Sequence, residues 1–309
     1  MAKKFERVII VIFENATREL VLANPYLNSL RTKGVFLDNS YGVTHPSQPN
    51  YIATLSGDTF GINGDDPFWV APYPTTPDPN TQPPVTSIID LLEAKKLTWK
   101  AYAENLRPVD IIQPPDIFFH PPPNFFYPPT AEKSGPGTDP LFSRRHVPFM
   151  SFPNIVTNPV RAANIVNAQS TFESDLAAGK LPNYSWYIPN LVNDGHSVLN
   201  SQGQPVTALP GEQNMENIAA FLKQFLGDDP LKRFPPKTLI VITFDEAFPY
   251  PEYDIYTLLI GDMLKPGSVQ SQVNTHYTLL RSIEDNFGIG TLGRNDAASE
   301  PLHFLANLK

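Results

Sequence analysis

The chain has 309 residues, no cysteine, and a formal net charge of −8 at pH 7. The lack of cysteine excludes disulfides and zinc–thiolate sites, and the acidic balance argues against a general nucleic-acid binder, because a phosphate backbone requires a basic surface. Hydrophobic residues make up 41% and charged residues 17%, which is typical of a globular domain, and no stretch approaches the roughly 18 apolar residues of a membrane span.

The first predicted element is a strand over Val8–Phe13, which runs directly into Glu14 and Asn15. A continuous apolar run of this length is typical of a strand buried on both faces in a parallel sheet. The residues 1–4 resemble the start of a signal peptide only faintly, since the apolar run that follows them is short. Two locations stay open: the cytoplasm, or an extracytoplasmic compartment if a leader has been removed.

The next informative segment is His45–Tyr51, which follows a predicted strand around Gly34–Leu37. Its prolines predict a turn, and the residues after them predict a short helix. Ser47 would then lie near a helix N-terminus, where free N–H groups and the helix dipole favour a phosphate or sulfate. A serine there becomes a good nucleophile only when it is activated, for example by a metal ion. The alternative is a plain helix-capping serine in a tight turn.

Proline is abundant, with 34 residues, and it is concentrated in the stretches 67–84 and 108–140. Such stretches cannot form regular helices or central strands. The aromatic residues among the prolines argue against solvated linkers and favour ordered loops that pack on the domain or rim a pocket. Since no shift in composition marks a second domain, we predict a single domain over residues 1–309 with these two inserts.

Strands and helices alternate along the rest of the chain. Helical spacing of apolar residues predicts three helices: Val85–Leu92, which begins with a Ser87–Asp90 capping box, Met215–Leu226 and His276–Phe287. Further strands are predicted at Trp99–Tyr102, Tyr184–Ile188, Leu239–Phe244 and Tyr256–Ile260. This alternation predicts an α/β fold, a three-layer α/β/α sandwich around a mostly parallel central sheet.

The strand Leu239–Phe244 also ends in acids, Asp245 and Glu246. In open α/β sheets, ligands bind beyond the carboxyl ends of the strands. The side chains of Glu14, Asn15, Asp245 and Glu246 would therefore meet at one edge. Their oxygen atoms, without any cysteine, suit a hard or borderline cation.

Five short motifs occur in order between residue 13 and about residue 287. They are Phe13-Glu14-Asn15, His45–Tyr51, Arg145–Phe149, Ile188-Pro189-Asn190 through Asn193–His196, and Phe244-Asp245-Glu246. In this order they resemble the phosphoesterase family, which groups bacterial acid phosphatases with phosphatidylcholine-type phospholipases C inside the alkaline phosphatase-like superfamily. Each motif alone is weak, whereas five in sequence are specific.

The resemblance implies one divalent metal ion held by Glu14, Asn15, Ser47, Asp245 and Glu246. Calcium, magnesium, manganese, iron and zinc all remain open as its identity. The related nucleotide phosphodiesterases and alkaline phosphatases bind a second metal through one aspartate and two histidines. Asp194-Gly195-His196 has a narrower spacing than their motif, so we favour one metal with a histidine-lined pocket.

The resemblance further implies a metal-dependent phosphomonoesterase similar to acid phosphatases, in which Ser47 attacks phosphorus and forms a phosphoserine intermediate. His196 or His146 would protonate the leaving oxygen. The remaining predicted substrate-binding residues are Asn50, His45, Asp194 and His276. His276 could equally be a core residue, and for Arg107, Arg144 and Arg145 a solvated surface position is the default expectation.

The predicted partner is a small phosphate ester, with no nucleic acid and no transmembrane segment. Two alternatives stay open. A phospholipase C, or another phosphodiesterase, would use the same residues on a diester. A noncatalytic phosphate-binding protein would keep the scaffold, although the intact set of Ser47, Asp245 and Glu246 argues against it. The physiological substrate and the oligomeric state do not follow from the sequence.

Overall fold

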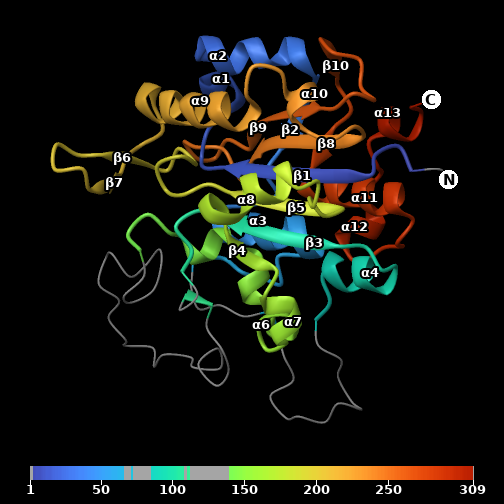
Figure 1. The fold of residues 1–309 in the computed structure, drawn as a ribbon. Coiled ribbons are helices and arrows are strands. Elements are labelled where there is room, and N and C mark those ends of the chain that lie inside the picture. Colours follow the sequence, from blue (N-terminus) through green and yellow to red (C-terminus); the bar gives the residue numbers. More distant parts are fainter. Residues whose placement is uncertain (1–2, 66–70, 72–84, 108–109, 112–138, 309) are drawn as a thin grey trace.

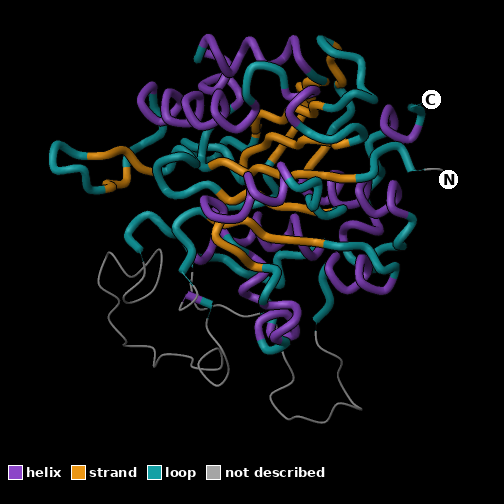
Figure 2. Tube along the Cα trace, in the orientation of Figure 1, coloured by secondary structure: helices purple, strands orange, loops and turns teal. Residues whose placement is uncertain are grey.

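In the computed structural model, a single mixed sheet forms the centre of the molecule (Figures 1 and 2). The structure describes residues 3–65, 71, 85–107, 110–111 and 139–308. Most of the two predicted inserts, 67–84 and 108–140, lies outside these residues, so their ordered packing remains a prediction. No described helix is both long and apolar enough to cross a bilayer.

Among the described residues the main sheet has nine strands, and its path runs β10-β2-β9-β8-β1-β5-β3-β4, with β11 beside β2. The strands are β1 (Arg7–Phe13), β2 (Val35–Tyr41), β3 (Trp99–Ala103), β4 (Ile165–Asn167), β5 (Tyr184–Ile188), β8 (Thr238–Phe244), β9 (Asp254–Ile260), β10 (Ser268–Gln270) and β11 (Asn274–Thr275). All described pairs are parallel except those of β9, which is antiparallel to both β2 and β8. A separate hairpin of β6 (Ser197–Leu199) and β7 (Pro205–Thr207) projects from the body at the left of Figure 1.

Helices cover both faces of the sheet, which confirms the predicted three-layer α/β/α architecture (Figure 1). One face carries α3 (Ser47–Ser56), α4 (Ile88–Ala94) and α11 (His276–Phe287), and the other carries α1 (Arg18–Ala23), α2 (Pro25–Ser29), α8 (Ala168–Ala177) and α9 (Glu212–Leu226). Shorter helices are α6 (Pro153–Val156), α7 (Pro159–Ala162), α10 (Pro230–Arg233), α12 (Asn295–Ala298) and α13 (His303–Ala306), with 3-10 turns at Leu30–Lys33, Arg144–His146 and Pro148–Ser151.

The central strand β1 shows why its sequence is apolar throughout. Its side chains alternate between the two faces, as in any strand. Ile10 and Ile12 enter the core beneath α3 and α11, while Ile9 and Val11 enter the core beneath α9. Each fully buried side chain of this kind stabilises the fold by about 2 kcal/mol. A polar residue at any of these positions would lose that contribution on one face.

The predicted helices and strands agree with the structure where the run or periodic spacing of apolar residues extends over many positions. The Ser87–Asp90 capping box forms at the start of α4, and Gly227 and Gly288 end α9 and α11. The sequence reasoning missed short elements such as β4, β10 and the β6–β7 hairpin, because three residues carry too little periodicity to identify a strand. It also did not specify the direction of β9, since a strand buried on both faces has the same apolar pattern in either direction.

Candidate active site

The register of β1 and β8 brings the two acidic strand ends together. The strands pair in parallel from Arg7 opposite Thr238 to Phe13 opposite Phe244, so both end at the same level. The N–H of Asp245 donates to the carbonyl of Phe13 at 3.0 Å. Asn15 adopts a left-handed conformation with φ of 50°, which asparagine tolerates better than most residues. Its N–H donates to Asp245 Oδ1 at 3.1 Å.

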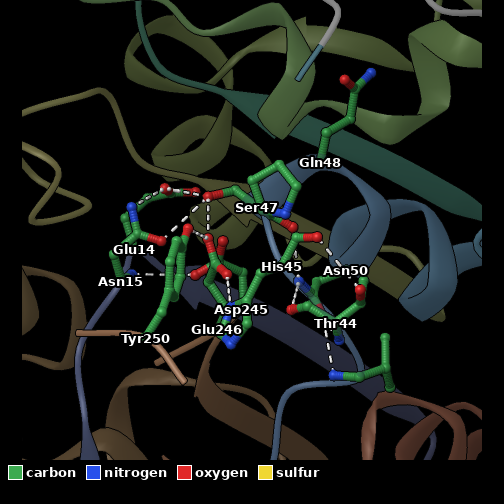
Figure 3. A network of polar contacts seen from close by, with 12 residues as sticks. Glu14, Asn15, Thr44, His45, Ser47, Gln48, Asn50, Asp245, Glu246 and Tyr250 are labelled. Carbon is green, nitrogen blue, oxygen red and sulfur yellow. Dashed lines mark hydrogen bonds and ion pairs between the residues drawn. The ribbon is translucent and has the colours of Figure 1, made fainter. Parts of the chain in front are cut away.

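Ser47 is the first residue of α3, and its hydroxyl points back to these strand ends (Figure 3). Its Oγ lies 3.0 Å from Glu14 Oε2, 3.1 Å from Asn15 Oδ1 and 3.1 Å from Glu246 Oε1. The helix has no side-chain cap, so the capping-serine alternative does not describe Ser47. The described structure therefore brings all five predicted metal ligands into one cluster, which we call the acidic cluster: Glu14, Asn15, Ser47, Asp245 and Glu246.

Two further residues of α3 hold this arrangement in place. The Tyr51 hydroxyl, one helical turn after Ser47, donates to Glu14 Oε1 at 2.7 Å. The Asn50 amide accepts from the N–H of Val43 and donates to the carbonyl of Pro46, at 2.9 and 3.0 Å. Asn50 is fully buried and therefore positions the turn before Ser47, rather than facing the substrate as the resemblance implied.

The carboxyl groups of the acidic cluster are electrostatically unfavourable in one another's presence. Burial raises the pKa of Glu14, and the charge of Arg145 partly opposes this. Burial, together with the charges of Glu14 and Glu246, raises the pKa of Asp245 well above its usual range. Burial and then Glu14 raise the pKa of Glu246 to about 8. Positive charge placed between these groups would relieve the repulsion.

His146 lies beneath the site and is almost fully buried. Its Nε2 is 3.1 Å from Glu14 Oε1 and its Nδ1 is 3.2 Å from Asp194 Oδ2. Asp194 also accepts the backbone N–H of His196 at 2.8 Å. His146 and Asp194 thus link the acidic cluster to the loop that carries His196, and neither lines the cavity described below.

The remaining two predicted histidines take supporting positions. His45 Nδ1 forms a hydrogen bond with Glu246 Oε2, and the His45 ring lies against Tyr250 and Tyr253, with centroids 4.1 and 4.4 Å apart. His276 Nε2 lies 2.6 Å from the backbone carbonyl of Asp245, and burial lowers its pKa to about 4. A neutral, buried His276 can hold the Asp245 backbone, but it does not reach the cavity.

A cavity of about 390 Å³ opens in front of Ser47. Of the predicted residues, Asn15, Ser47, His196 and Glu246 line it. The other lining residues are Pro46, Asp65, Arg145, Gly195, Thr207, Ala208, Leu209, Pro210, Phe248 and Tyr250. The cavity therefore combines three residues of the acidic cluster, one histidine and one arginine with apolar side chains.

The default expectation of a surface position is wrong for Arg144 and Arg145, which are only 2% and 7% exposed. Arg145 Nη1 pairs with Asp65 Oδ2 at 2.9 Å. Its Nη2 lies 3.5 Å from His196 Nε2. Because arginine can only donate, Nε2 of His196 is the acceptor in this contact.

The acidic cluster fits the predicted cation by the chemistry of its donors. Ser47 has one hydroxyl proton and three oxygens within 3.1 Å, so its hydroxyl can donate to only one of them at a time. Asp245 Oδ2 is buried without a hydrogen-bond partner among the described residues. Among the described residues, no group of three or more His, Cys, Asp or Glu side chains is arranged to hold a metal ion. The hydroxyl oxygen of Ser47 and the amide oxygen of Asn15 would therefore be needed as further ligands.

Comparison with known families agrees with this arrangement. The sequence profile of the phosphoesterase family matches residues 22–290. The chain belongs to the phosphoesterase family. The match spans every motif quoted above except Phe13-Glu14-Asn15, which precedes it.

Curated proteins similar to this chain include a probable acid phosphatase from Kluyveromyces lactis, 30% identical over 98% of this chain and 63% of its own length. An acid phosphatase from Aspergillus fumigatus is 31% identical over 98% of this chain and 59% of its own length. A phosphatidylinositol-3-phosphatase from Mycobacterium tuberculosis is 26% identical over 94% of this chain and 79% of its own length. The chain thus spans about three-fifths of the first two relatives.

Solved structures confirm the fold. A protein of the alkaline phosphatase superfamily from Vibrio parahaemolyticus superposes with a TM-score of 0.55 at 11% identity, covering 98% of this chain and 71% of that one. The phosphonate monoester hydrolase from Silicibacter pomeroyi gives 0.52 at 12% identity, covering 98% and 77%. At these low identities the two structures establish the fold of the chain and carry no information about its chemistry.

Three residues of the candidate site were not predicted from the sequence: Tyr51, Asp65 and Tyr250. Tyr51 could have been found, because residues four apart lie on one face of a helix and Ser47 was already placed at the start of α3. Asp65 and Tyr250 lie in loops, where no periodicity indicates which way a side chain points. The Tyr250 hydroxyl donates to Glu246 Oε1 at 3.2 Å.

Proposed function

We propose that this chain hydrolyses phosphate monoesters, with Ser47 as the nucleophile and a phosphoserine intermediate. The observation that carries the proposal is the single hydroxyl of Ser47, surrounded by three acceptor oxygens at the mouth of a cavity. The acid phosphatases from Kluyveromyces lactis and Aspergillus fumigatus support the substrate class.

In the first step, Ser47 Oγ attacks phosphorus and the bond to the leaving oxygen breaks. The serine proton passes to an adjacent carboxylate, for which Glu14 at 3.0 Å is the nearest acceptor. Water then attacks the phosphoserine and releases inorganic phosphate and Ser47. Such transfers depend mainly on positioning and on stabilisation of charge, which a rigid helix start beside two fixed strand ends supplies.

His196 is the candidate acid for the leaving oxygen, because it lines the cavity whereas His146 lies beneath it. Arg145 Nη2 lies 3.5 Å from His196 Nε2, so the guanidinium and the imidazole can reach the same phosphoryl group. A bound phosphoryl dianion would stabilise the imidazolium and the guanidinium together. Substrate binding would thereby help to charge the acid that the reaction needs.

We infer that the five residues of the acidic cluster hold one divalent metal ion. When bound, it would neutralise charge that develops on the phosphoryl oxygens and lower the pKa of the Ser47 hydroxyl. Glu14, Asp245 and Glu246 would supply negative charge, and Asn15 a neutral oxygen. Tyr51 and His276 would hold Glu14 and the Asp245 backbone in place.

A phosphodiesterase on the same site, including a phospholipase C, is the second candidate. The apolar side chains that line the cavity favour it, since Leu209 is 76% exposed and Phe248 and Tyr250 line the same cavity. Such a lining could accommodate the second ester group of a diester. Turnover of p-nitrophenyl phosphate compared with p-nitrophenyl phosphorylcholine separates the two candidates.

Replacement of the nucleophile tests the main proposal. We expect Ser47→Ala to abolish turnover of p-nitrophenyl phosphate while the melting temperature stays near that of the wild type. Acid quenching of the wild type during turnover should yield a peptide with phosphate on Ser47, detected by mass spectrometry. Ser56→Ala is the matched control, because Ser56 ends the same helix and, among the described residues, its hydroxyl contacts only the backbone carbonyls of Ile52 and Asp58.

Turnover at the wild-type rate by Ser47→Ala would remove this residue from the mechanism. Tight phosphate binding by a wild type that hydrolyses no ester would instead favour a noncatalytic phosphate-binding protein.

A further inference from the structure

The carboxylate of Asp65, which lines the cavity, contacts two hydrogen-bond donors, one from Gln48 and one from Arg145. Asp65 Oδ1 accepts the N–H of Gln48 at 3.0 Å. Asp65 Oδ2 pairs with Arg145 Nη1 at 2.9 Å. The Asp65 side chain is only 21% exposed and that of Arg145 only 8%. An ion pair this sheltered is screened by solvent much less than one on the surface.

These two donors are the groups that a phosphoryl oxygen would use. Gln48 directly follows Ser47, and the N–H groups in the first turn of a helix have no acceptor within the helix. They therefore form a ready site for an anion. Arg145 has the planar fork of N–H groups that matches a phosphate. Gln48 thus adjoins the hydroxyl that would attack phosphorus, and Arg145 lines the same cavity as that hydroxyl.

We propose that the Asp65 carboxylate occupies the place of a phosphoryl oxygen and competes with substrate and product for Gln48 and Arg145. This inference rests on the proposed function of Ser47. Binding of a phosphate ester would require Asp65 to give up one or both contacts. Asp65 thus weakens affinity for the phosphoryl group and speeds the release of inorganic phosphate.

The chain before Asp65 can allow this displacement. Gly61 has φ of 72°, and a Cβ placed at Gly61 or Gly64 would have no described atom within 4 Å. Among the described residues, the segment therefore has no close contact at these two points. Phe60 and Ile62 pack this segment against the core beneath α3, so the displacement would be confined to Asp65 and the backbone next to it.

A different role would give opposite results. If Asp65 only orients Arg145 for the substrate, its removal would release the guanidinium and weaken phosphate binding. The competing role predicts tighter binding, because the donors become free and one negative charge leaves the cavity. The sign of the change in phosphate affinity therefore separates the two roles.

The test compares Asp65→Asn with the wild type by calorimetric titration with inorganic phosphate. Asparagine keeps an oxygen for Gln48 but lacks the charge that attracts Arg145. We expect the Kd for phosphate to fall about tenfold, equivalent to about 1.4 kcal/mol, with a similar fall in KM for p-nitrophenyl phosphate. Asp65→Ala should give at least the same effect.

Asp58→Asn is the matched control, since Asp58 precedes Asp65 in the same loop. Its Oδ1 accepts the N–H of Phe60. Its phosphate affinity should equal that of the wild type. Unchanged or weaker phosphate binding by both Asp65 variants would overturn the inference. Because this readout needs no turnover, it stays decisive even if the enzyme hydrolyses no ester in the assay panel.

Discussion

Helix α3 has a buried acidic group at each end, and the two groups differ in what surrounds them. At its start, Ser47 contacts the acidic cluster and faces the cavity. Beyond its end, Gly57 lies so close to Asp296 that a Cβ would be 2.5 Å from Asp296 Oδ1. Asp296 in turn faces Glu284 of α11, and both are fully buried.

Burial acts on the carboxyl groups at both ends in the same direction. It raises the pKa of Glu284 to about 9, with Asp296 as the next contribution, as it raises that of Glu246 to about 8. A perturbed carboxyl alone therefore does not identify a reactive site. Only the start of α3 adds a hydroxyl, an amide oxygen and an open cavity. We infer that the Glu284–Asp296 pair is structural and is stabilised by keeping a proton.

The largest expected effect is on turnover, and it distinguishes the acidic group at the start of α3 from the one near its end. Asp245→Asn should lower turnover by about three orders of magnitude, as for loss of a group that stabilises charge in the transition state. In the presence of a chelator its melting temperature should not fall, because the substitution removes repulsion from Glu14 and Glu246. Glu284→Gln is the control and should keep the wild-type kcat. Equal loss of activity in both variants would erase the distinction between the ends.

Removal of divalent cations should give the next largest effect. Dialysis against EDTA should lower turnover about a hundredfold or more, and one divalent cation should restore it, because the acidic cluster would otherwise remain uncompensated. The melting temperature should fall with the metal, since a ligand that binds only the folded state stabilises it. Elemental analysis before and after dialysis identifies the ion. Full activity with no bound metal would contradict the predicted cation.

The smallest effect concerns stability at the other end of α3. Glu284 has a folded-state pKa of about 9 against an ordinary value of 4.5, so between these values the folded state binds a proton that the unfolded state has released. Its contribution to stability therefore falls as pH rises, by up to about 1.4 kcal/mol per pH unit. Glutamine in its place lacks this dependence.

Urea unfolding of the wild type and Glu284→Gln at pH 6, 7 and 8 measures this difference. The free energy of unfolding of the variant should rise relative to the wild type with each step in pH. The acidic cluster titrates in both proteins and cancels in the comparison. Parallel curves for the two proteins would show that Glu284 is already ionised in the folded state.

The sequence reasoning succeeded where one strong pattern decides the result. The apolar runs of β1 and β8 are long, and each ends in two polar residues. Parallel pairing then brings Glu14 and Asp245 to one edge of the sheet. The resemblance to the phosphoesterase family further predicted that Ser47 lies beside these two residues. The assignment of roles to these residues stays a prediction that the experiments above test.

The contacts of a side chain were harder to predict where they depend on the path of a loop. Asn50 and His276 belong to helices that were predicted, yet their polar atoms hold the backbone near Pro46 and at Asp245. Arg145 was expected at the surface and is buried against Asp65. A polar residue near a site can contact either substrate or backbone, and its sequence neighbours do not distinguish the two.

By itself the sequence determined the α/β architecture, the phosphoesterase motifs and the acidic ends of two strands, because periodicity and local order depend on neighbours along the chain. Only the tertiary structure decided that Asp65 meets Arg145 and Gln48, that His196 rather than His146 lines the cavity, and that a second acidic pair closes the far end of α3. Those contacts join residues from separate loops and helices. Their geometry follows from how the layers pack, which no local pattern records.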